Sequence, residues 1–174
     1  MDLTPRARGR ILARRGNAPA ETRRGGPPMP SPVVADAAAI AAMIPDGASV
    51  ALMREPDQPM EVVRALIARG ARDLHVITVP TSGLATDALI GADCVGTVET
   101  SGVSLSEFGP APFFVEAVKA GSVRLKDATC PAVHSALLAG TKGVPFMAIR
   151  GIVGSDLLKA RPDWTVIQNP MAEE

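Results

Sequence analysis

Cysteine, histidine and aromatic residues are scarce in this 174-residue chain. It contains two cysteines, Cys94 and Cys130, and no CxxC pair. This excludes a disulfide framework and a cysteine-rich zinc module, and it is typical of a reducing compartment. The two histidines, His75 and His134, are too few for a histidine-rich metal site, so we expect no bound metal. One tryptophan, four phenylalanines and no tyrosine argue against a base-stacking surface for nucleic acid.

The sequence also lacks a net charge of one sign and long apolar runs. Its 18 basic and 18 acidic side chains cancel, so it lacks the positive excess that nucleic acid or an anionic membrane would attract. No apolar run approaches the roughly 20 residues that span a bilayer. Hydrophobic residues still make up 47% of the chain, which excludes global disorder. We therefore expect one domain, two at most, in the cytoplasm, without nucleic-acid or membrane partners.

The balanced total conceals an uneven distribution of charge. Residues 1–31 carry seven arginines against Asp2 and Glu21, a net charge of +5, together with several glycines and prolines. Because this segment has little to bury, we predict a disordered arm over residues 1–31 and a folded domain over residues 32–174. A solvated tail is the simplest role of the arm, and binding to RNA or acidic surfaces and mitochondrial targeting are the alternatives. No apolar core follows the arginines, so we expect no secretory signal.

Helical and strand-like patterns alternate along the folded part of the chain. Glycine and proline separate them, since these residues start and stop helices. Ser31 suits the cap of the first helix, because Pro32 follows at the first helical position. The predicted helices cover residues 33–44, 59–70, 86–90, 113–121 and 131–138. The predicted strands cover residues 48–53, 74–79, 94–99, 122–127 and 145–149, and a sixth at 164–168 is an open alternative.

We interpret these strands as apolar on both faces, which requires helices on both sides. The pattern therefore predicts an α/β fold with an open, mostly parallel sheet layered with helices. In such sheets, ligands bind beyond the carboxyl ends of the strands. Ser82 and Gly83 follow the second predicted strand, and Glu99 ends the third. These three residues are candidate contacts to a substrate.

No standard nucleotide-binding motif or nucleophile elbow is present. Glu107 lies in a loop near glycines, where a carboxylate can act as nucleophile or base, although a solvated loop glutamate is the simpler interpretation. Cys130 and His134 lie four residues apart and share one face of a predicted helix. A thiol at a helix start can be activated, so a Cys–His nucleophile pair is conceivable. A packed, unreactive thiol is the more common arrangement.

The segment GIVGSD, residues 151–156, precedes a short predicted helix, LLKA. Backbone N–H groups at such a position can bind an anion, which makes Gly154, Ser155 and Asp156 candidate contacts to substrate or coenzyme A. Ser155 or Asp156 can equally serve only as the cap of that helix.

Five segments, taken in order, resemble the A (alpha) chain of family I coenzyme A transferases, which include glutaconate and 3-oxoacid CoA-transferases. The resemblance covers about residues 33–170, and the phrase PFMAIRGIVGSDLL is its most specific part. The segments are IPDGASVAL (44–52), LIARGARDLHVI (66–77), ALIGADCV (88–95), FVEAVKAGSV (114–123) and GVPFMAIRGIVGSDLL (143–158).

The resemblance implies an open α/β fold and a reaction that moves coenzyme A between carboxylic acids. Enzymes of this family consist of paired A and B subunits and form a glutamyl-CoA thioester, and the nucleophilic glutamate normally belongs to the B subunit. The implied partners are therefore a B-type subunit, together with an acyl-CoA and a carboxylic acid. Coenzyme A enters as a thioester substrate, and no tightly bound cofactor is implied.

Three features depart from the family pattern. ALMREPDQP (51–59) stands where a glycine-rich loop is expected, so the backbone cannot approach a ligand as closely. The resemblance stops near Pro170, where relatives continue with further strands, so we expect a sheet edge that needs cover or a second polypeptide. SEFG (106–109) resembles a B-subunit nucleophile motif of the SENG type, but it lies at an A-subunit loop position and Phe108 replaces asparagine. Glu107 is therefore only a weak nucleophile candidate.

The leading hypothesis is an A-type (alpha) subunit of a CoA-transferase-like heteromer, inactive alone, whose nucleophile resides in a B subunit. One alternative is a subunit of an enzyme that hydrolyses or ring-opens CoA thioesters in steroid breakdown. Another is a non-catalytic, shortened homologue that binds a partner.

Overall fold

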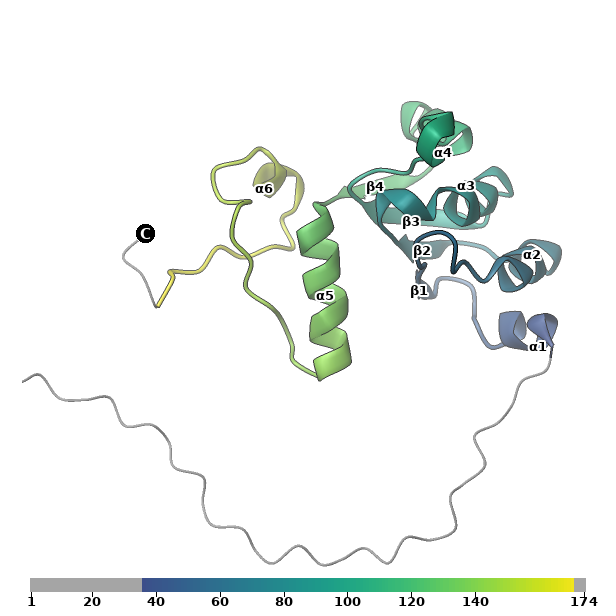
Figure 1. Cartoon of the computed structure of the whole chain (residues 1–174), viewed down its shortest axis with the longest axis horizontal. Coiled ribbons are helices and arrows are strands. Elements are labelled where there is room, and N and C mark those ends of the chain that lie inside the picture. The colour runs from purple at the N-terminus through teal and green to yellow at the C-terminus, as the bar shows by residue number, and fades with distance from the viewer. Residues whose placement is uncertain (1–35, 171–174) are drawn as a thin grey trace, which may run out of the picture. The chain divides into compact units, whose positions relative to one another are not determined.

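The computed structural model describes residues 36–170 and contains four strands in one open sheet (Figure 1). The strand order is β1-β2-β3-β4, and every neighbouring pair is parallel. This confirms the predicted α/β fold with an open, parallel sheet. The proposed arm over residues 1–31, which includes Ser31, lies outside the described residues. The strands are β1 (Ser49–Ala51), β2 (Leu74–Ile77), β3 (Val95–Thr100) and β4 (Arg124–Asp127).

A helix follows each strand, as a parallel sheet requires. Figure 1 shows α1 to α4 side by side along one side of the sheet. No helix within the described residues is both long and apolar enough to cross a membrane. The α-helices are α1 (Ala37–Ala42), α2 (Met60–Ala68), α3 (Gly83–Gly91), α4 (Pro112–Ala120), α5 (Cys130–Lys142) and α6 (Leu157–Ala160). Two short 3-10 helices, η1 (Pro80–Ser82) and η2 (Ser106–Phe108), lie in the loops after β2 and β3.

Successive residues of a strand point to opposite faces of the sheet. In this sheet the two faces differ in polarity. Val50, Val76 and Val98 lie side by side across β1, β2 and β3, and the last two are fully buried. The expectation of strands that are apolar on both faces is therefore wrong. One face holds the core, and the other carries polar side chains. The alternate positions include Ser49, His75, Thr97, Glu99, Arg124 and Lys126.

The main core lies between the apolar face and the first four helices. Helix α2 contributes Val63 and Leu66, and α3 contributes Ala85 and Leu89, all of them almost completely buried. Asp87, also in α3 and buried, accepts a hydrogen bond from the Phe114 backbone N–H at 2.8 Å and so holds the first turn of α4. Burial raises the pKa of Asp87, although the hydrogen bonds from the α4 backbone oppose this shift.

Two predicted strands do not form in the described residues. Residues 145–149 and 164–168 pair with no strand, so the predictions of a fifth strand and of the open sixth are wrong. The segment 144–149 is apolar enough for a strand, but Pro145 lacks an N–H donor and the side chains of Val144, Phe146 and Met147 remain exposed. An apolar run indicates burial, whereas a strand also needs a neighbouring strand.

Helix boundaries differ from the predictions in three places. Helix α3 begins at Gly83 instead of residue 86, because the loop after β2 continues directly into it through η1. Asp36 caps the described part of the first helix, and its Oδ1 accepts a hydrogen bond from the Ala38 N–H at 2.8 Å. Helix α5 extends to Lys142 and ends at Gly143, whose φ of +64° suits glycine.

Candidate functional site

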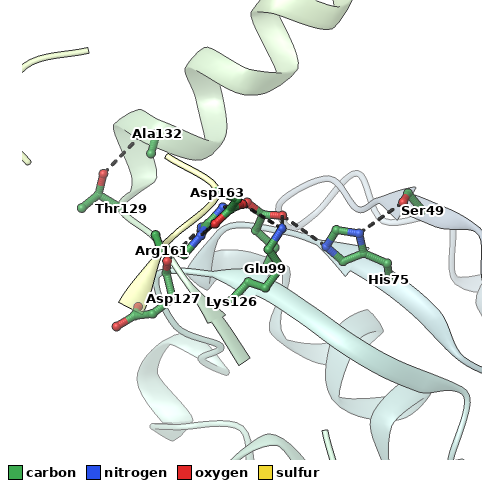
Figure 2. A network of polar contacts seen from close by, with 9 residues as sticks. All are labelled: Ser49, His75, Glu99, Lys126, Asp127, Thr129, Ala132, Arg161 and Asp163. Carbon is green, nitrogen blue, oxygen red and sulfur yellow. Dashed lines mark hydrogen bonds and ion pairs between the residues drawn. The ribbon is translucent and has the colours of Figure 1, made fainter. Parts of the chain in front are cut away.

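Glu99 lies at the centre of a cluster of charged groups on the polar face of the sheet. Its Oε1 is 2.7 Å from Arg161 Nη2, and its Oε2 is 3.2 Å from His75 Nε2 and 3.5 Å from Lys126 Nζ. His75, Glu99 and Lys126 come together because they occupy paired or adjacent register positions in β2, β3 and β4. Figure 2 shows Arg161 and Asp163 reaching this row from a separate stretch of chain.

Arg161 connects the segment after α6 to the sheet through its hydrogen bonds. Its side chain is only 2% exposed, and it makes paired contacts of 2.9 Å with both carboxylate oxygens of Asp163. Its Nη1 also donates to the backbone carbonyl of Asp127, at 2.9 Å. The guanidinium lies 4.1 Å from the centre of the Trp164 ring, close enough for a cation–π contact. The planar guanidinium thus bonds two carboxylates and a carbonyl at once, which a lysine cannot match.

The ionisation of this cluster follows from its hydrogen bonds. The Arg161 hydrogen bonds, with a further contribution from Lys126, hold the pKa of Asp163 far below its usual range, while burial acts in the opposite direction. Burial alone would lower the pKa of Arg161, but the hydrogen bonds to Asp163 and Glu99 outweigh it and raise that pKa. Both groups are therefore charged at neutral pH, and the Glu99 carboxylate is engaged by cations instead of being free to attack a substrate.

His75 links this cluster to β1. Its Nδ1 lies 3.2 Å from Ser49 Oγ, and its Nε2 faces Glu99 (Figure 2). The contact of Nε2 with Glu99 is a close approach without hydrogen-bond geometry, whereas Nδ1 and the serine hydroxyl are hydrogen-bonded. The chain Ser49–His75–Glu99 has the order of a serine–histidine–carboxylate relay, but it lies on the face of the sheet and not at the carboxyl edge.

Ser82 and Gly83 serve as packing residues in the loop after β2. Ser82 is fully buried, donates to the Val79 carbonyl at 2.9 Å, and contacts the hydroxyl groups of Thr78 and Thr86. A Cβ atom on Gly83 would overlap the Ser104 carbonyl oxygen, so only glycine fits there. Both residues fix the start of α3 at the carboxyl edge. Their contact with a ligand remains a prediction.

Gln58 is a residue of this edge that the sequence did not single out. It lies in the loop that replaces the expected glycine-rich segment, and its Oε1 accepts a hydrogen bond from the Ala85 N–H at 3.1 Å. Its Nε2 is buried and has no partner among the described residues. Nothing in the sequence marks this glutamine as a contact of α3, because the contact depends on where α3 begins.

Cys130 is the first residue of α5, after the capping residue Thr129, whose Oγ1 accepts from the Ala132 N–H at 3.3 Å. The thiol is half-buried instead of packed in the core. Its Sγ lies 3.0 Å from Ser101 Oγ. His134 lies one turn later in α5 and is exposed. The structure therefore pairs Cys130 with a serine from the β3 loop and shows no Cys–His contact.

Glu107 lies in η2, in the loop between β3 and α4. Its side chain is exposed, and the neighbouring Phe108 is 82% exposed. None of the described residues donates a hydrogen bond to its carboxylate. It thus has no group positioned to activate it or to stabilise an oxyanion nearby.

The segment around Gly154 forms an exposed turn before the four-residue helix α6. Ser155 Oγ donates to the Ile152 carbonyl at 2.6 Å. Asp156 occupies the N-cap position, but it makes no capping hydrogen bond and pairs with Lys159 at 2.6 Å instead. The proposed anion contacts of these residues remain predictions. No group of three or more histidine, cysteine, aspartate or glutamate side chains suited to a metal occurs within residues 36–170.

Comparisons with known proteins indicate a relationship to the A subunits of CoA-transferases. No family model matches the sequence. The chain is 29% identical over 119 residues to the A subunit of 3-oxoadipate CoA-transferase from Pseudomonas knackmussii, a match that covers 67% of this chain and 42% of that protein. It also matches the crystal structure of a variant of the decarboxylase AibA/AibB, with a TM-score of 0.67 and 29% identity over 78% of this chain and 53% of the other. The chain thus spans about half the length of these relatives, and it resembles the A subunit of a CoA-transferase in sequence and such a decarboxylase in fold.

Proposed function

We propose that this chain is an A-type subunit of a CoA-transferase-like heteromer that moves coenzyme A between carboxylic acids in the cytoplasm. The observation that carries the proposal is the similarity over 119 residues to the A subunit of a CoA-transferase, on a matching α/β fold. In this proposal residues 32–174 form the subunit domain and residues 1–31 a dispensable arm. An acyl-CoA and a carboxylic acid are the substrates.

The geometry of the two candidate carboxylates supports a nucleophile on a partner subunit. Glu99 is engaged by Arg161 and Lys126, and a carboxylate held by cations is a poor nucleophile. Glu107 is exposed and lacks positioned donors, although covalent catalysis needs an activated nucleophile and a stabilised oxyanion. Neither residue is prepared for thioester exchange in this chain.

The direct test is reconstitution with a B-type subunit encoded by the same genome. The two chains are co-expressed, with an affinity tag only on the B subunit, and the purified complex is assayed for transfer of coenzyme A from an acyl-CoA to a carboxylate. We expect co-purification and transfer by the complex, with none by either chain alone. Failure of every neighbouring B-type chain to bind would contradict the proposal.

A second candidate is a different reaction of CoA thioesters on the same scaffold, either hydrolysis or ring opening. The replacement of the glycine-rich loop by a segment with Arg54, Glu55 and Gln58 favours it, because these side chains change the carboxyl edge where ligands bind. The structural relative is itself a decarboxylase. Product analysis of the reconstituted complex separates the candidates, since hydrolysis releases free coenzyme A without an acceptor acid. A complex with neither activity favours a non-catalytic homologue.

A further inference from the structure

We draw no further inference here: the strongest candidate, the mostly apolar cleft between α5 and the segments 144–153 and 158–167, lies open, and nothing in the described residues shows what covers it.

Discussion

At the scale of single residues, Arg161 determines the character of the polar cluster. It lies 62 positions after Glu99 in the sequence, yet its guanidinium joins Glu99, Asp163 and the backbone of β4. The sequence singled out Glu99 as a strand-end carboxylate, but it could not supply the partners. An arginine in a proline-flanked loop looks solvated until the fold brings it against the sheet. Glu99 was therefore predicted as a candidate, whereas its ion pairs were not.

The first prediction concerns the loss of the Arg161 side-chain charge. Arg161→Met leaves the Glu99 and Asp163 carboxylates without their main partner, and we expect a loss of roughly 2–3 kcal/mol in the free energy of unfolding. This lies below the usual cost of breaking a buried pair, because Asp163 is 43% exposed and water screens it. Urea denaturation measures the change. Arg64→Met is the control: Arg64 pairs with Glu61 on the surface of α2, and its loss should cost less than about 1 kcal/mol. Equal losses of unfolding free energy in the two variants would show that the Arg161 cluster does not stabilise the fold more than a surface ion pair does.

The second prediction concerns pH. The pKa of Asp163 is lowered in the folded chain, so its stabilising contribution is present above the unfolded-state pKa of about 4 and is lost as the pH falls through the folded-state value. The difference in unfolding free energy between the native chain and Asp163→Asn should therefore be largest near pH 7 and shrink below about pH 4. Urea titrations at several pH values measure it. A difference that stays constant down to about pH 3 would contradict the assignment.

At the scale of elements, the order of helices and strands up to α5 and the short helix α6 could be predicted, whereas the conformation of segments 144–149 and 164–168 could not. Periodicity and glycine or proline boundaries identify a helix or a strand that packs on a neighbour nearby in sequence. The segment 145–149 has a strand-like composition, but no strand lies beside it in the described residues. The same limitation applies to Gly83, which the sequence placed only in a loop as a candidate substrate contact. Its close neighbour, Ser104, comes a complete helix and strand later, so the sequence does not show this packing.

The third prediction tests that close approach. In Gly83→Ala the new methyl group meets the Ser104 carbonyl oxygen, so α3 or the β3 loop must shift, at a cost of about 1–3 kcal/mol. Gly140→Ala in α5 is the matched control. No atom lies within 4 Å of its added Cβ, and alanine should stabilise that helix by about 0.5–1 kcal/mol. The melting temperature and the urea midpoint should fall for Gly83→Ala and rise for Gly140→Ala. A stabilised Gly83→Ala would show that the loop adapts without strain.

At the scale of the whole molecule, the second face of the sheet is the notable surface. Parallel sheets are normally covered by helices on both faces. Here the four helices α1 to α4 cover the apolar face (Figure 1), while the other face presents polar side chains, with Arg161 and Asp163 bonded to part of it. The chain spans about half the length of the relatives it matches. The polar face, which only part of the chain covers, fits the proposal that the chain works within a larger assembly.

The last prediction follows from that proposal: the isolated chain forms no covalent intermediate with an acyl-CoA. A glutamyl thioester requires a carboxylate held near the thioester carbonyl and donors directed at the oxyanion. Glu107 is exposed without such donors, and Glu99 is paired with cations. Incubation with acyl-CoA followed by hydroxylamine or borohydride should therefore modify no glutamate of this chain. In the reconstituted complex, mass spectrometry should locate the modified glutamate in the B subunit. An adduct on Glu107 of the isolated chain, abolished by Glu107→Gln, would instead identify this chain as the catalytic subunit.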